Sequence, residues 1–119
     1  MARKAFFLKR LNEHVQYLKK INATLQGEAD FQGTTHQDCP LGQWIYGNGE
    51  TEVAAMKNSR AQELFKSLLA PHEQFHLLSQ EALQKKQAGD EAGASLALTG
   101  MHLFSTILTH KLLELDNMD

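Results

Sequence analysis

Apolar residues recur along most of the chain at alternating steps of four and three, which is the spacing of one buried face of an α-helix. The first pattern runs from about residue 5 to residue 26 and predicts a helix that stops at Gly27. Its predicted buried face consists of Phe7, Leu11, His14, Leu18, Ile21 and Leu25. His14 is the single polar residue on that face, so it is the first candidate for chemistry.

A second pattern predicts a helix from residue 59 to residue 87, with Ser59 as its N-cap. Pro71 should kink this helix or split it, with Pro71 at the start of the second half, because proline removes a backbone hydrogen bond and clashes with the preceding turn. The predicted buried face consists of Phe65, Leu69, His72, His76, Ser79 and Leu83. Two more histidines therefore fall on positions that face a core.

A third long helix is predicted from residue 90 to about residue 116, after a turn at Gly89. Its predicted inner face consists of Ala97, Met101, Phe104, Leu108, Leu112 and Leu115. His102 and His110 lie at or beyond the edge of this face, so we expect neither to reach a site inside the bundle.

Residues 27–51 show no periodicity and are rich in glycine, which predicts a long connector. Residues 40–46 predict a short helix that Gly47 would end, and a further helical turn is predicted near residues 52–56. No segment has the pattern of a strand. We therefore predict an all-α fold, an antiparallel four-helix-type bundle with a short extra helix in the connector, forming one domain over residues 1–119.

The composition excludes several classes of function. With 119 residues and a net charge of −2, the chain has room for one core and lacks the basic stripe of a nucleic-acid-binding protein. No apolar run approaches the roughly 20 residues of a membrane span, and the run near the basic start of the chain is too short for a signal peptide. The single cysteine, Cys39, excludes an internal disulfide and predicts a cytoplasmic location.

Six histidines and one thiol raise the question of a metal site. His72 and His76 are four residues apart, so they lie on the same helix face and can bind one metal ion. With His14 they make three imidazoles on core faces, and leaving their nitrogens unpaired would cost about 1–3 kcal/mol each. One zinc ion would remove that cost, and Cys39 is the candidate fourth ligand of a closed tetrahedral site.

Cys39 lies in the one part of the connector that looks ordered. Gly42 would allow a close backbone approach there, and Trp44 offers a large apolar anchor against the bundle. We interpret both as residues that position the ligand and do no chemistry. His36, three residues before Cys39, is an alternative ligand, although its loop position favours exposure to solvent.

Two catalytic interpretations compete with this one. The segment His72-Glu73-Gln74-Phe75-His76 has the H-E-x-x-H form of zinc metalloproteases, with Glu73 as general base. That chemistry needs an open coordination position, which is lost if His14 and Cys39 both bind. Glu73 and His76 also form one Glu-x-x-His motif, but a di-iron bundle needs two. We predict no enzymatic activity, and a purely structural zinc stays open as the alternative to a sensor.

Three separated motifs in this order resemble the chemoreceptor zinc-binding (CZB) domain family. They are His14 followed by the aromatic Tyr17, the segment Cys39-Pro40-Leu41-Gly42-Gln43-Trp44, and the pair His72 and His76. The resemblance covers nearly the whole chain. One departure is Gln43, where a basic residue is common in the family.

The resemblance implies one Zn²⁺ held by three histidines and one cysteine, which places the ligands at His14, Cys39, His72 and His76. It implies a sensor of zinc availability or of oxidants such as hypochlorous acid. Family members are often fused to chemoreceptor signalling regions or diguanylate cyclases, so we expect a stand-alone member here. We expect it to form a homodimer and to act on a signalling partner in trans.

Overall fold

The computed structural model describes residues 7–118, and most of them are helical. Three helices are long: α1 (Phe7–Leu25), α5 (Leu69–Gln87) and α6 (Glu91–Met118). Shorter segments lie between α1 and α5: α2 (Pro40–Trp44), the π-helical segment η1 (Ile45–Gly49), α3 (Glu50–Ala54) and α4 (Ser59–Lys66). No strand occurs among residues 7–118, so the predicted all-α class is confirmed.

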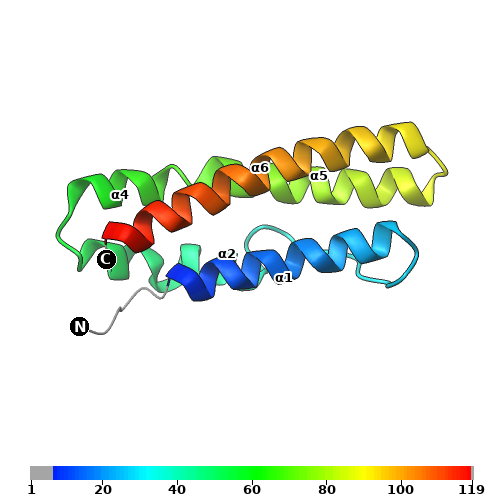
Figure 1. The fold of residues 1–119 in the computed structure, drawn as a ribbon. Helices are drawn as coiled ribbons and strands as arrows, with labels where there is room; N and C mark the ends of the chain where they lie inside the picture. Colours follow the sequence, from blue (N-terminus) through cyan, green and yellow to red (C-terminus); the bar gives the residue numbers. More distant parts are fainter. Residues whose placement is uncertain (1–6, 119) are drawn as a thin grey trace.

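The long helices pack side by side in an elongated bundle about 49 Å long and 21 by 20 Å across. In Figure 1, α5 and α6 form an antiparallel hairpin, and α1 runs in the same direction as α5 and opposite to α6. The chain turns between α5 and α6 at Gly89, whose φ of +79° suits glycine. In the chain, the connector lies between α1 and α4, and it runs back along the bundle in the direction opposite to α1. The predicted antiparallel four-helix-type arrangement is therefore confirmed, with an irregular segment in place of the second long helix.

The predicted helix over residues 59–87 is split into two helices, as Pro71 indicated, and the break lies at Ser67 and Leu68. The break precedes Pro71 because proline cannot donate a hydrogen bond to the carbonyl of Ser67 and its ring would clash there. Pro71 then lies in the first turn of α5, where it is tolerated. The predicted cap was wrong: Asn58, and not Ser59, accepts the first backbone N–H groups of α4.

The prediction that Gly47 ends a short helix is confirmed. Two helical segments meet at a kink there, and Gly47 itself is non-helical, with φ and ψ of −105° and −106°. Of the first predicted helix, residues 5 and 6 lie outside the described part of the chain.

The predicted inner faces meet along the bundle axis. The largest side chains that are fully buried there include Phe7, Ile21, Phe75, Met101, Leu108, Leu112 and Leu115. Five residues that were also predicted to face inward are partly buried and pack against this core: Leu11, Leu18, Leu25, Leu69 and Phe104. His14, His72 and His76 are buried on the same faces as predicted, at 3%, 0% and 3% exposure.

By length and composition alone, α6 is apolar enough to cross a membrane, although the sequence pattern did not suggest a span. Core helices of soluble proteins share these properties, so the evidence is weak. In this fold α6 packs against α5 and α1 and contributes Met101, Leu108 and Leu112 to the core.

Candidate metal centre

Three metal-binding side chains meet where the connector crosses α5. Cys39, His72 and His76 are all buried, and one ligand atom from each lies within 4.8 Å of the other two. The Cys39 Sγ is 3.3 Å from the His72 Nε2, and the two imidazole rings are 4.8 Å apart. A thiol and two imidazoles are ligands that zinc prefers, so the chemistry of the group fits that ion.

Each side chain is positioned by a simple local feature. His72 and His76 are four residues apart on α5 and therefore share one face of the helix. Cys39 caps α2 in extended conformation, and the backbone N–H of Gly42 donates to its Sγ at 3.2 Å. A side chain at Gly42 would collide with the carbonyl oxygen of His36. Only glycine fits there, as the sequence indicated, and the tight turn aims the sulfur at α5.

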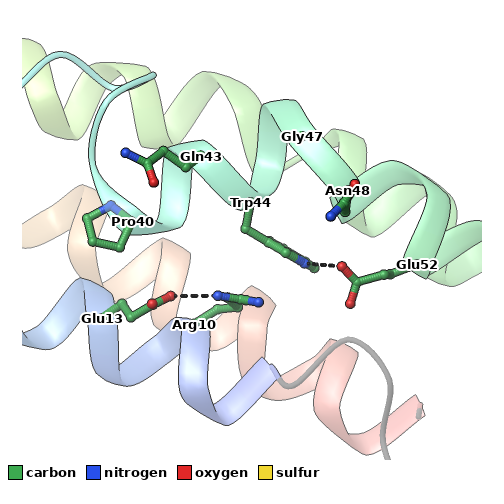
Figure 2. A pocket seen from close by; sticks show the side chains of 8 residues that line it. All are labelled: Arg10, Glu13, Pro40, Gln43, Trp44, Gly47, Asn48 and Glu52. Carbon is green, nitrogen blue, oxygen red and sulfur yellow. Dashed lines mark hydrogen bonds and ion pairs between the residues drawn. The ribbon is translucent and has the colours of Figure 1, made fainter.

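Trp44 anchors this turn against the bundle, also as predicted. Its ring packs edge-on against Phe7 at 5.9 Å and Phe65 at 5.6 Å, and its Nε1–H donates to Glu52 at 2.9 Å. Figure 2 shows Trp44 with Glu52 on one wall of a surface pocket, facing the ion pair of Arg10 and Glu13 on α1.

The pocket in Figure 2 has a volume of about 270 Å³. Arg10, Glu13, Pro40, Gln43, Trp44, Gly47, Asn48 and Glu52 line it. None of the three clustered ligands is among them. The pocket therefore lies beside the metal group and does not open onto it.

A backbone carbonyl fixes the orientation of His76. The His76 Nδ1 lies 3.0 Å from the carbonyl oxygen of Thr34 in the connector, and a carbonyl can only accept, so Nδ1 carries the proton. The lone pair of His76 is therefore on Nε2. The Tyr17 hydroxyl holds Thr34 in turn, since it donates to the Thr34 carbonyl at 3.3 Å and accepts from the Thr34 N–H at 2.8 Å.

His72 shows a second sign that the group is built for an ion. Its side chain is 0% exposed, and its buried Nδ1 has no hydrogen-bond partner among residues 7–118. Leaving such an atom unpaired costs about 1–3 kcal/mol. A metal bound to Nε2, the nitrogen that lies 3.3 Å from the Cys39 Sγ, would give the ring a strong contact that helps to offset this cost.

Burial keeps the three histidines neutral at physiological pH. It lowers the pKa of His72 from 6.5 to about 3, and repulsion from neighbouring imidazoles adds to the shift. Burial likewise lowers the pKa of His14 and of His76 to about 4. The pKa of the Cys39 thiol is raised by burial, against the effect of nearby backbone N–H groups. Each imidazole thus presents a lone pair, and the thiol must lose its proton on binding metal.

His14 is buried nearby but is not one of the three clustered ligands. Its ring packs against Phe75 at 4.6 Å, and Phe75 in turn packs against His76 at 5.5 Å. The His14 Nε2 lies 2.9 Å from the hydroxyl of Ser105 on α6. The structure thus brings together three of the four predicted ligands. The fourth, His14, packs against Phe75, and Phe75 in turn packs against His76.

The weaker candidates lie outside the group. His36 is partly buried, with its ring 6.3 Å from that of His72. His102 and His110 are exposed on α6, as expected. Glu73, the general base of the protease interpretation, is exposed too and does not face the buried site.

The sequence analysis missed the two groups that do contact the imidazoles. One is the Thr34 carbonyl, and because it belongs to the backbone no residue type could have revealed it. The other is Ser105, which falls four residues after Met101 and three before Leu108 on the buried face of α6. A small polar residue at a core position was the available signal.

Comparison with known proteins agrees with this geometry. Residues 14–83 match the model of the family described as the chemoreceptor zinc-binding domain. Searches of curated proteins and of solved structures gave no match to the chain. The matched segment covers more than half of the 119 residues and contains His14, Cys39, His72 and His76. The chain therefore belongs to the chemoreceptor zinc-binding domain family, and its buried cysteine and histidines are suited to bind Zn²⁺.

Proposed function

We propose that this protein is a regulatory domain in which zinc is held in a closed site by His14, Cys39, His72 and His76. The supporting observation is that Cys39, His72 and His76 already lie together, with His14 buried one ring away. Four protein ligands fill a tetrahedral zinc site, so no coordination position remains for an attacking water. The role is therefore sensing or regulation, and not hydrolysis.

The sensor proposal depends on the position of Cys39. The thiol belongs to the connector, whereas His72 and His76 belong to α5, so a zinc ion ties an irregular segment to a rigid helix. Loss of the bond to sulfur would release the connector while leaving the helix in place. A change of ligation is thereby converted into a change of shape.

Two stimuli fit such a site, and both act through the same bond. A fall in free zinc would empty it. Hypochlorous acid would oxidise the Cys39 thiolate to sulfenic acid, with chloride as the reduced product, and weaken the metal bond. A thiolate ligand persists in a reducing compartment, which supports a cytoplasmic location.

The output is proposed to pass through protein contacts. Leu77, Leu96 and Leu103 are 54%, 76% and 59% exposed on α5 and α6, so these apolar side chains are available for contacts with another chain. We propose a homodimer that acts on a signalling protein in trans, with residues 1–119 working as one unit. Sedimentation with and without zinc tests the dimer, and a monomer in both conditions would contradict it.

The ligand set is tested by measuring zinc stoichiometry and affinity in competition with a chromophoric chelator. We expect one zinc per chain. His14→Ala, Cys39→Ser and His76→Ala should each lower the affinity steeply, because each removes one of four bonds. His36→Ala, His102→Ala and His110→Ala are the matched controls and should bind zinc like the wild type. Equal losses in all six variants would show that the ligands are wrongly assigned.

A purely structural zinc is the second candidate, because ligation can supply about 10–16 kcal/mol of apparent binding energy to a small domain. The two are distinguished by treating the zinc-loaded protein with hypochlorous acid at one equivalent. A sensor releases zinc, keeps its helical circular dichroism and gains hydrogen exchange in the connector. A protein that unfolds on zinc loss, or keeps zinc after Cys39 is oxidised, would favour the structural role.

A further inference from the structure

The hydrogen bond between His14 and Ser105 joins two buried residues that are far apart in the chain. The two residues are separated by 91 positions, lie on α1 and α6, and are 3% and 6% exposed. Their Nε2 and Oγ atoms are 2.9 Å apart. Because α6 begins after residue 83, Ser105 lies outside the segment that matches the family.

Ser105 differs from three other hydroxyl residues on α5 and α6. Ser79, Thr99 and Thr106 each donate to the carbonyl oxygen four residues earlier in their own helix, at 2.7, 3.1 and 3.0 Å. That local bond is the ordinary one for a serine or threonine inside a helix. Ser105 instead has its bond to an imidazole on another helix, which points to a role outside its own helix.

We propose that Ser105 is the positioning residue for His14 in the zinc site. A neutral imidazole carries one N–H and one lone pair, on opposite nitrogens. If Ser105 accepts the Nε2–H of His14, the ring is held in one tautomer and the lone pair is on Nδ1, available to the metal. The inference rests on the proposed function, because it assumes that His14 is a ligand.

A hydrogen bond of the same kind orients His76, another proposed ligand. The carbonyl of Thr34 accepts the Nδ1–H of His76 and leaves Nε2 as the lone-pair atom. Partners of this kind fix the tautomer and orientation of ligand histidines, and their removal lowers metal affinity about 10- to 100-fold. The connector, which contains Thr34, is already tied to the metal through Cys39. The element that Ser105 would add is α6, through the histidine on α1.

The first test is the zinc affinity of Ser105→Ala. We expect it to fall about 10- to 100-fold, while Ser105→Thr, which keeps the hydroxyl, stays near the wild-type value. Ser79→Ala is the matched control, because Ser79 is equally buried but bonds only to the carbonyl of Phe75 in its own helix. An unchanged affinity in Ser105→Ala would overturn the proposal, and so would a raised affinity, which would mean that Ser105 competes with the metal.

The second test reads the imidazole directly, by long-range nitrogen–proton correlation of ¹⁵N-labelled protein. We expect His14 to carry its proton on Nε2 in the metal-free and zinc-bound protein, and Ser105→Ala to give a mixture of tautomers when metal-free. Zinc bound at Nε2 would overturn the proposal.

The two proposals fail in different ways. If His14→Ala binds zinc like the wild type, the four-ligand set itself is wrong. If His14→Ala loses affinity but Ser105→Ala does not, the ligand set stands and only the role of Ser105 falls.

Discussion

The connector between α1 and α2 and the hairpin of α5 and α6 are held in place by different kinds of contact. The hairpin is an apolar interface, in which Phe75, Met101 and Leu108 are 0% exposed. The connector has no regular structure over residues 29–35. It is held by hydrogen bonds of Phe31, Gln32 and Thr34 to α1 and α5, and Phe31 also packs against Tyr17 at 5.1 Å.

This difference separates what the metal stabilises from what the core stabilises. Two attachments of the connector involve the metal group, one through Cys39 itself and one through the Thr34 carbonyl that orients His76. The hairpin has a large buried surface that does not depend on those groups, and burial of about 25 cal/mol per Å² is its main source of stability. A change at the metal should therefore reach the connector first.

Zinc removal should have the largest effect on stability, and it directly tests the difference between the connector and the hairpin. Ligation of this type is worth about 10–16 kcal/mol of apparent binding energy. We expect a strong chelator to increase hydrogen–deuterium exchange over residues 29–44 by a large factor, and to change the far end of the hairpin, where α5 and α6 meet at Gly89, much less. Equal loss of protection in both regions would mean that the metal holds the whole fold together.

Acidification of the metal-free protein should give the next largest effect. Folding lowers the pKa of His72 to about 3 and that of His14 and His76 to about 4, from 6.5 when exposed. The unfolded chain therefore binds more protons below pH 6.5, so stability falls as the pH drops from 6.5 towards 4. Each histidine should contribute about 1.4 kcal/mol per pH unit.

Urea denaturation of the metal-free protein between pH 7 and pH 5 measures this dependence. His76→Gln is the control, because it removes one of the three titrating groups and should reduce the slope by about one third. A midpoint that does not change with pH would contradict the burial of neutral imidazoles.

Leu108→Ala tests the other region. Leu108 is 0% exposed in the core, and its truncation should reduce the free energy of unfolding by about 2–5 kcal/mol through lost burial and a cavity. Zinc affinity of the folded protein should stay near the wild-type value, since Leu108 is not one of the residues of the metal group. Leu113→Ala, at a 39% exposed position of the same helix, is the control and should be nearly neutral.

The two regions also differ in how far the sequence predicts them. Apolar spacing placed the long helices and their inner faces because their packing follows one repeating pattern. The types and spacing of His72, His76 and Cys39 were enough to predict the metal group. The break at Ser67 was displaced from the expected position because proline acts on the turn before it.

The orientation of the ligands could not be predicted in the same way. His76 is oriented by a backbone carbonyl, which leaves no trace in residue type. The contact between His14 and Ser105 depends on the register of α1 against α6 across 91 residues. Such details are set by the assembled bundle, and periodicity within a single helix does not contain them.

Tyr17→Phe should give the smallest of these effects and the most local one. The variant keeps the ring that packs against Phe31 and His76 but loses the hydroxyl bonded to the N–H and carbonyl of Thr34. We expect a loss of about 1 kcal/mol in unfolding free energy, typical of a hydrogen bond. Because Thr34 orients His76, zinc affinity should fall as well, by less than in His76→Ala. Exchange should rise at Thr34 and not in α6, and a rise in α6 would mean that the connector and the hairpin are coupled more tightly than their contacts indicate.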